Sequence, residues 1–393
     1  MTLSADCKPA QRPKRELIHG FSMNKYIVIA MIGLGGCVAV QTDEEKEISD
    51  RTPIVTDLES ATFERVAGPA VKESVFDVGP AGSFYSAYVG SPTVDYDGKV
   101  FRMWFVGAAE SDDPSVPYGY LEQIGLATSA DGLNWMVENE GRPVFSPGPD
   151  GSADAKSLSH PYVLRTGGRF MMWYGAIDGT IAGDLGLAPS HVRVERICVA
   201  TSHDGIHWQR ANGGRPVLDI GDENAIDSIQ ATGMHVLRIG GRFVMWYGAY
   251  DGLHTLALAT SDDGVHWNHE NDGRSLTGLN GAQQLGPSVH FDGQRYFMLY
   301  NHGFETSWRA YAAVSDDGVH WRNLPGEYGV LGHAPAGNFA ANGDPSNNHS
   351  VHPTKMIYHD SAVWVWYTGE DPEHPGRGRI GVMRAQLPNS ENE

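Results

Sequence analysis

The sequence has few cysteines and few basic residues, and both shortages exclude classes of protein. Its 393 residues include three cysteines, too few for a disulfide framework, and Cys198, in the apolar stretch "RICVATS", is expected to be a small buried side chain. Lysine and arginine number 29 against 48 aspartates and glutamates, which gives a formal net charge of −19. Beyond one short basic run at residues 8–15, no basic cluster stands out. A nucleic-acid partner is therefore not expected.

Several catalytic and metal-binding motifs are also missing from the sequence. It contains no Gly-rich phosphate loop, no nucleophile elbow and no redox cysteine pair. A transition-metal site would have to combine histidines from distant segments that no spaced motif links, namely His160, His302, His349 and His352. We therefore expect no required cofactor.

The sequence has no long hydrophobic run, but a short one lies near its start. The apolar segment from Tyr26 to Leu34 follows Lys25 and is too short to span a bilayer as a stable helix. The stretch Leu34-Gly35-Gly36-Cys37 resembles a bacterial lipobox, which predicts a signal peptide within residues 1–37 and a lipid on Cys37. Residues 38–59 would then be a polar linker to a cell-envelope membrane, which we expect to be the outer membrane. The alternative is a cleaved signal peptide and a soluble secreted or periplasmic protein.

One nine-residue motif dominates the rest of the chain. It occurs four times, as "ATSADGLNW" (127–135), "ATSHDGIHW" (200–208), "ATSDDGVHW" (259–267) and "AVSDDGVHW" (313–321). An apolar aromatic stretch such as "FMMWYGA" (170–176) precedes each copy, and a fifth, "VWVWYTG" (363–369), follows near the end. Each repeat reads as strands A to D, with the Asp-Gly turn between C and D. Repeated antiparallel four-stranded units predict an all-β, five-bladed β-propeller over residues 60–388, with residues 389–393 as a tail.

The fifth repeat lacks its last strand. After "RIGVMRAQL" (379–387) the chain ends without a strand D, whereas residues 63–79 resemble the strand-D segment 208–221. We therefore expect the N-terminal segment to supply the outer strand of blade five. Such closure removes an open sheet edge.

The recurring Asp-Gly turn is expected to be structural. Its aspartate can accept turn amides, its glycine supplies a positive φ, and its tryptophan packs between blades. This applies to Asp131, Asp204, Asp263 and Asp317. The B–C loops and D-to-A crossovers gather on the opposite face, where the repeats differ, so function is expected there.

The motifs "MWYGA" and "ATSxDGxxW" and the five repeats resemble the five-bladed glycosidases of the arabinanase, invertase and levansucrase type, including glycoside hydrolase families 43 and 32, and the related mannoside phosphorylases. The resemblance covers roughly residues 60 to 388 and implies inward-facing carboxylates for glycosidic cleavage. Many members carry an Asp before a Pro at the head of an inner strand. The matching pairs here are Ser91-Pro92, His160-Pro161, Gly286-Pro287 and His352-Pro353.

The last blade carries a second resemblance. The stretch "NNHSVHP" (347–353) is similar to the Gly-His-Ser segment of arabinanase-like enzymes, where the histidine lies near the axis, often beside calcium. The resemblance implies a central His349 and a possible Ca²⁺ at the axis.

Three acidic residues are the catalytic candidates. Asp154 and Asp227 stand in matching register, seven residues before Pro161 and Met234, and we expect both at the heads of inner strands at the axis. Glu305 is the candidate acid, because apolar neighbours raise the pKa of a carboxyl. The alternative for the two aspartates is that they cap crossover turns. Separately, Asp178, Asp251 and Glu370 are the other candidates for the proton donor.

Aromatic, basic and histidine side chains of the same face are the candidate substrate-binding residues. They are Tyr85, Tyr88, His160, Trp308, Arg309, His349 and His352, although such aromatic residues can also simply pack blades together. The sequence thus predicts an envelope glycoside hydrolase that acts on oligo- or polysaccharides with paired carboxylates. The alternative is a non-catalytic glycan-binding surface lipoprotein.

Overall fold

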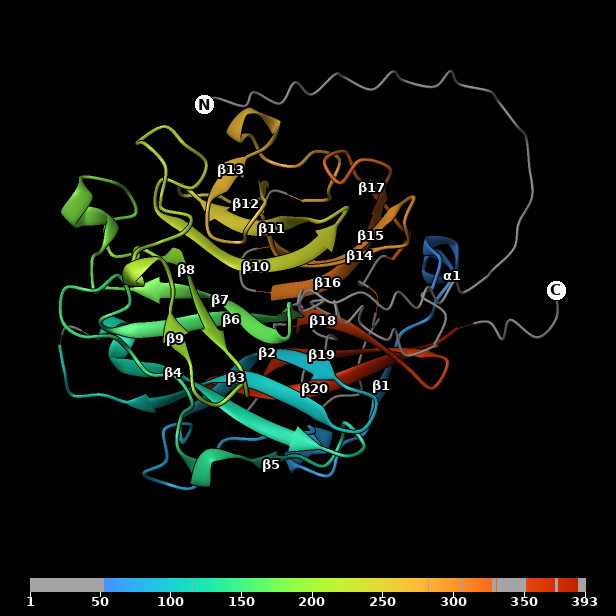
Figure 1. The fold of residues 1–393 in the computed structure, drawn as a ribbon, viewed down its shortest axis with the longest axis horizontal. Coiled ribbons are helices and arrows are strands. Elements are labelled where there is room, and N and C mark those ends of the chain that lie inside the picture. The colour runs from blue at the N-terminus through green and yellow to red at the C-terminus, as the bar shows by residue number, and fades with distance from the viewer. Residues whose placement is uncertain are drawn as a thin grey trace, which may run out of the picture. The chain divides into compact units, whose positions relative to one another are not determined.

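The computed structural model describes residues 53–114, 116–281, 283–304, 307–326, 330, 351–371 and 374–387. In this part of the chain, five antiparallel sheets of four strands form a ring, so the predicted five-bladed propeller is confirmed (Figure 1). Residues 1–52, with Cys37 and the apolar run, lie outside the described residues, as do residues 388–393. None of the described helices combines the length and apolar character that a membrane crossing requires. Cys198 is buried, as expected.

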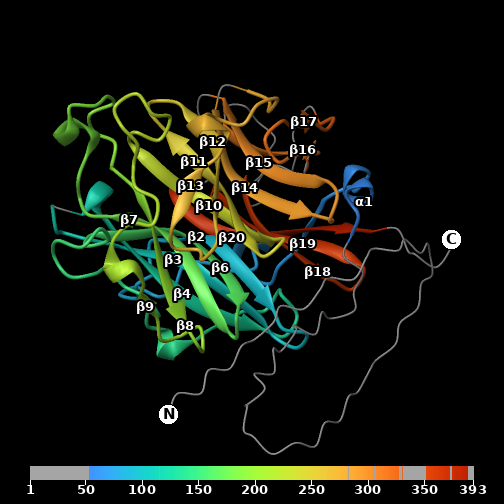
Figure 2. The same cartoon turned by 45° about the horizontal axis from the view of Figure 1, so that its top comes forward.

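The blades follow one another along the chain, as the colour sequence in Figures 1 and 2 shows. Blade one contains β2 (Tyr88–Tyr96), β3 (Phe101–Glu110), β4 (Tyr120–Ser129) and β5 (Met136–Val137). Blade two contains β6 (Ser157–Thr166), β7 (Arg169–Ile177), β8 (Arg196–Ser202) and β9 (Gln209–Arg210). Blade three contains β10 (Gln230–Ile239), β11 (Arg242–Tyr250), β12 (His254–Ser261) and β13 (Trp267–His269). Blade four contains β14 (Gln283–Phe291), β15 (Tyr296–Phe304), β16 (Ser307–Ser315) and β17 (Arg322–Asn323).

Blade five is built from both ends of the propeller. It contains β18 (Val351–His359), β19 (Ala362–Asp371), β20 (His374–Gln386) and, as its outer strand, β1 (Glu64–Val66). Glu64 pairs with Arg384 and Val66 with Val382, so the predicted closure by the N-terminal segment is confirmed. Figure 1 shows blue β1 beside the red strands of this blade.

Short helices complete the described chain. The α-helix α1 (Val55–Glu59) precedes β1, and its residues fall within the segment expected to be a linker. The 3₁₀ turns are η1 (Val71–Glu73), η2 (Pro117–Gly119), η3 (Asn139–Gly141), η4 (Ala182–Leu185), η5 (Asn212–Gly214) and η6 (Asn271–Gly273).

The repeated Asp-Gly turns hold neighbouring blades together. In blade two, Asp204 Oδ1 accepts the amides of Ile206 and His207 at 2.9 and 2.8 Å. The buried Trp104 of blade one donates its indole N–H to the Gly205 carbonyl of this turn at 2.8 Å. Equivalent bonds join Trp173 to Gly264, Trp246 to Gly318 and Trp366 to Gly132. The predicted structural role of the motif is therefore confirmed.

Candidate functional site

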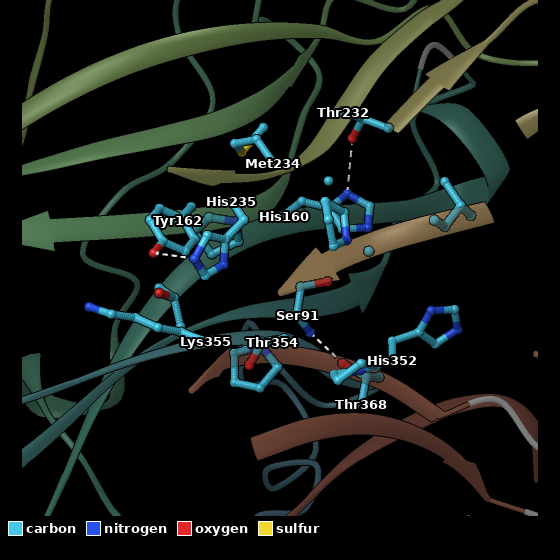
Figure 3. Close-up of a pocket in the computed structure, with 18 of the residues that line it drawn as sticks. Ser91, His160, Tyr162, Thr232, Met234, His235, His352, Thr354, Lys355 and Thr368 are labelled. Carbon is cyan, nitrogen blue, oxygen red and sulfur yellow. Dashed lines mark hydrogen bonds between the residues drawn. The ribbon is translucent and has the colours of Figure 1, made fainter. Parts of the chain in front are cut away.

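A β-bulge near the middle of each inner strand brings five backbone segments to the propeller axis. The register shifts at residues 91–92, 160–161, 233–234, 286–287 and 354–355. In the first four bulges the leading residue has a left-handed backbone, with φ between 43° at His160 and 56° at Gly233. Bulges kink a strand and redirect its side chains. Together they line a cavity of about 250 Å³ (Figure 3).

The bulge of blade five corrects one match made from the sequence. His352-Pro353 was aligned with the other X-Pro pairs, but the register of this strand shifts after Pro353. His352 instead lies in the regular ladder opposite Thr368. Its side chain still lines the cavity.

Glu195 is the single carboxylate among the described residues that line this pocket. It directly precedes β8 and is 2% exposed. It accepts hydrogen bonds from the hydroxyls of Ser159 and Thr232, which belong to two different blades. A side chain at Gly175 would collide with the Glu195 carboxylate and the Ser159 hydroxyl and displace them.

Two basic groups accompany this carboxylate. His160 Nδ1 lies 3.4 Å and Arg193 Nε 3.7 Å from Glu195. Burial raises the pKa of Glu195, but the hydrogen bond from His160, the charge of Arg193 and the hydrogen bond from the Ser159 hydroxyl outweigh burial and lower it to about 2. Arg193 also binds Glu122 at 2.8 Å, which fixes its guanidinium. Glu195 is therefore ionised at neutral pH.

Three further histidines and a lysine also line the pocket. Burial lowers the pKa of His254 and of His352 to about 4 and that of His235 to about 3, so these rings are neutral at pH 7. His235 Nε2 lies 3.2 Å from the Tyr162 hydroxyl, as Figure 3 shows. Lys355 approaches the Val163 carbonyl at 3.4 Å, and burial lowers its pKa. Among the described residues, no carboxylate is within ion-pairing distance of Lys355.

The structure brings together three of the predicted substrate-binding residues, because Tyr88, His160 and His352 all line the pocket. Trp308 lies beside it, with its ring centroid 6.2 Å from that of His352. Arg309 follows Trp308 in β16 and is not among the lining residues.

Other predicted site residues lie elsewhere or outside the described residues. Tyr85 packs within blade one, with its ring centroid 5.9 Å from that of Phe105, and does not line the pocket. Glu305 and His349 lie outside the described residues. The expected calcium at the axis stays a prediction, and the described residues contain no cluster of three or more His, Cys, Asp or Glu that could hold a metal ion.

The predicted position of Asp154 and Asp227 at the axis is wrong. Asp154 is buried away from the pocket, where it accepts hydrogen bonds from the Tyr174 hydroxyl at 3.0 Å and from Arg210 Nε on the outer strand at 2.7 Å. Asp227 accepts one from the Tyr247 hydroxyl at 2.9 Å. The matched register is real, but at this point of each crossover the side chain points between strands B and D. Both aspartates therefore brace a blade.

The sequence did contain a signal for the residues that were missed. Glu195 stands seven residues before Ser202, and His254, Trp308 and Glu122 stand seven before the corresponding serines 261, 315 and 129. This position heads strand C, and it contributes the pocket residues Glu195 and His254. The residue seven positions before the motif serine, at the start of strand C, therefore marks the pocket in the sequence. The residue seven positions before the inner-strand bulge, which selected Asp154 and Asp227, does not. Arg193, His235 and Lys355 had no comparable signal.

The chain was compared with family models, with known protein sequences and with solved structures. No family model matches the chain. It is 30% identical over 302 residues to uncharacterized protein MT1551 of Mycobacterium tuberculosis (strain CDC 1551 / Oshkosh), an alignment that covers 75% of this chain and 90% of the relative. The chain belongs to the same family as this mycobacterial protein.

Two further proteins match this chain over shorter stretches. Uncharacterized protein Rv1502 of Mycobacterium tuberculosis (strain ATCC 25618 / H37Rv) is 34% identical over 114 residues, 29% of this chain and 34% of the relative. A 1,2-beta-oligomannan phosphorylase of Thermoanaerobacter sp. (strain X514) is 27% identical over 173 residues, 44% of this chain and 49% of the relative. The chain thus spans only about a third and a half of the lengths of these two proteins.

Solved structures share the fold at low identity. One comes from work on the GH130 family of mannoside phosphorylases and has a TM-score of 0.60 at 16% identity, covering 82% of this chain and 93% of that chain. Another is Zg3597, a family 117 glycoside hydrolase produced by Zobellia galactanivorans, with a TM-score of 0.59 at 14% identity, covering 85% and 92%. The five-bladed glycoside-hydrolase-like fold is confirmed, whereas the expected likeness to families 43 and 32 is not supported, since these neighbours belong to families 130 and 117.

Proposed function

We propose that the protein is a carbohydrate-active enzyme that cleaves a glycosidic bond in the axial pocket. The observation that carries the proposal is the ionised Glu195, held by hydroxyls from two blades and facing His160 at the propeller axis. Support comes from the partial match to a protein named 1,2-beta-oligomannan phosphorylase. It also comes from the fold shared with a structure of the GH130 family of mannoside phosphorylases, which contains glycoside hydrolases that target beta-1,2 mannosidic linkages.

The pocket favours phosphorolysis over hydrolysis by two carboxylates. Hydrolysis of that kind needs a second carboxyl group, as acid or nucleophile. The described pocket offers one, together with the cations Arg193 and Lys355. Such cations suit an anionic co-substrate like inorganic phosphate. A phosphate oxygen would bond to the anomeric carbon as the glycosidic C–O bond breaks, and the leaving oxygen would take up a proton.

His160 is the proposed partner for that proton. Glu195 stays ionised and cannot donate, but its contact with Nδ1 orients the imidazole. The other ring nitrogen is then available to exchange a proton with the leaving oxygen. In this arrangement Glu195 is a positioning residue and His160 is the acid.

The test is a panel of 1,2-linked mannooligosaccharides and other oligosaccharides, incubated with and without inorganic phosphate. Sugar 1-phosphate should form only when phosphate is present, and His160→Ala should lower turnover by at least a hundredfold. Glu140→Gln is the control, because Glu140 is an exposed residue of η3, outside the pocket. Free sugar with equal yield in both conditions would show hydrolysis. Absence of any cleavage or binding would contradict the proposal.

A non-catalytic glycan-binding role is the second candidate. It is favoured by the lack of a second carboxylate in the described pocket lining. Oligosaccharide binding measured by calorimetry, with no product after long incubation with phosphate, would support this role over the first.

We also propose that the protein is tethered to the cell envelope by a lipid on Cys37, on the strength of the lipobox-like Leu34-Gly35-Gly36-Cys37. Fractionation of bacteria that express wild type and Cys37→Ser should find the first in membranes and the second in the soluble fraction. A wild-type protein already soluble would contradict the anchor.

A further inference from the structure

A row of aromatic side chains lies beside the axial pocket. This aromatic collar consists of Tyr118, Tyr250, His254, Trp308 and His352, which come from blades one, three, four and five. Ring centroids are 4.3 Å apart between Tyr250 and His254, 5.7 Å between His254 and Trp308, and 6.2 Å between Trp308 and His352. Burial and, to a smaller extent, the neighbouring Asp251 and Tyr118 raise the pKa of the Tyr250 hydroxyl, so Tyr118 lies near this end of the collar.

The collar is continuous with the pocket. His254 and His352 belong to both, and Figure 3 shows His352 beside the other lining residues. At the opposite end of the collar, the guanidinium of the pocket residue Arg193 lies 5.5 Å from the centroid of the Tyr118 ring. A molecule bound in the pocket therefore meets the collar directly when it extends outwards.

Tyr118 is too exposed for a packing role. Its side chain is 60% exposed, on a residue with a left-handed backbone (φ 61°). Its neighbour Arg193 contacts the ring and, through its main-chain N–H, donates to the Tyr118 hydroxyl at 3.5 Å. The ring is thus held in place while much of its surface stays open.

The size of the pocket limits what it can enclose. Its volume of about 250 Å³ is below the range of roughly 300 to 1,000 Å³ typical of pockets for drug-sized ligands. This is room for little more than one sugar ring. The remaining sugars of a longer substrate must lie outside the pocket, where aromatic faces can pack against the C–H faces of pyranose rings.

We infer that the substrate is an oligosaccharide whose terminal sugar occupies the axial pocket and whose following sugars stack on the aromatic collar, chiefly on Tyr118. This inference rests on the proposed function, since it assigns the second subsite of the same site. It predicts that affinity rises with chain length and that the collar, not the pocket, produces the rise.

Calorimetric titration with mannose and with 1,2-linked mannooligosaccharides of two to four units tests the inference. Wild type should bind the oligosaccharides at least tenfold more tightly than the monosaccharide. Tyr118→Ala should lose about this tenfold gain and keep the monosaccharide affinity. Tyr118→Phe should retain the tenfold gain, because the ring face is preserved. His207→Ala is the control, since His207 is exposed on the opposite face in a C–D turn.

The outcomes separate this inference from the proposed function. If wild type cleaves oligosaccharides but its affinity is independent of chain length, or if Tyr118→Ala keeps the gain, the collar subsite is wrong and the enzyme assignment stands. If wild type neither binds nor cleaves any sugar of the series, both are overturned. Unchanged melting temperatures of the variants exclude misfolding as the cause of a lost gain.

Discussion

Glu195 shows how a buried carboxylate can stay charged at the centre of a propeller. Burial alone would favour its neutral form, but His160, Arg193 and the Ser159 hydroxyl reverse this preference and lower its pKa to about 2. The charge costs desolvation energy, which hydrogen bonds from two blades offset. Such a group stabilises the fold and also orients its neighbours.

The stability contributed by Glu195 should therefore depend on pH. Its folded pKa of about 2 is below the reference of 4.5, so the contribution is present above pH 4.5 and is lost as pH falls towards 2. The shift corresponds to about 3 kcal/mol at neutral pH. Urea unfolding should find Glu195→Gln less stable than wild type by about this amount at pH 7, with the gap closing between pH 4.5 and 2. A stability difference that stays constant over this pH range would contradict the lowered pKa of Glu195. The control Glu140→Gln should show no such pH-dependent difference from wild type.

Asp154 is expected to act on stability and not on turnover. Asp154→Asn leaves the partly buried Arg210 without its charge partner, which should cost about 3 kcal/mol in free energy of unfolding. Asp227→Asn is the matched variant in blade three, where His269 Nδ1 lies 3.9 Å away, and it should cost less, about 1 kcal/mol. Turnover per folded molecule, measured on the best substrate of the panel, should be unchanged in both. A loss of turnover by several orders of magnitude at constant melting temperature would show that these aspartates belong to the active site.

At the scale of elements, the C–D turn is the unit that joins one blade to the next. Ser202 and Asp204 order the turn, and its Gly205 carbonyl then receives the indole N–H of Trp104 from the preceding blade. The same contact recurs at three other blade junctions. Blade four has Leu299 at the tryptophan position, so this bond is missing at its junction with blade five.

Asp204→Ala tests the importance of this turn. The variant loses the acceptor of two main-chain amides, which should lower the free energy of unfolding by about 1 to 2 kcal/mol, as loss of a helix cap does. Turnover per folded molecule should not change, because the turn lies on the face opposite the pocket. Asp262→Ala provides the control, since Asp262 forms only an exposed ion pair with Arg242 and should change stability by less than 0.5 kcal/mol or so. Equal losses of unfolding free energy in the two variants would show that the turn has no special role in stability.

The elements that repeat along the chain are the ones that could be predicted from the sequence. The blades, the C–D turns and the closing strand repeat or resemble one another along the chain, so periodicity was enough to predict them. The same periodicity paired Asp154 with Asp227 correctly, but register does not tell which way a crossover side chain points. Register along strand C marks the position of Glu195 in the sequence, but its partners Ser159 and Thr232 lie 36 and 37 residues away, so their contacts with it could not be predicted. Such a site depends on contacts between blades, which only the folded ring makes visible.

At the scale of the whole molecule, the N-terminal segment compensates for the missing tryptophan at the junction of blades four and five. Val55, Leu58 and Phe63 are buried in one cluster with side chains from both blades. Polar contacts hold α1 to blade four: the Val55 amide donates to Asp292 at 2.8 Å, and Glu59 pairs with Arg295 at 3.1 Å. The ring is thus closed twice, by β1 in the sheet of blade five and by α1 between the blades.

Truncation should separate these contributions. A chain that begins at residue 53 keeps every contact described for α1 and β1, so its melting temperature should match that of the full chain. A chain that begins at residue 62 loses Val55 and Leu58, each worth roughly 1.5 to 3 kcal/mol, and should be clearly less stable.

A chain that begins at residue 67 also loses Phe63 and β1 and exposes the edge of β20. The summed loss is then comparable to the typical total stability of about 5 to 15 kcal/mol, so this chain should be unfolded or aggregated when examined by circular dichroism and size-exclusion chromatography. If it melts like the chain that begins at residue 53, the ring does not depend on its N-terminal closure, and the four tryptophan contacts together with blade packing must be sufficient to hold it.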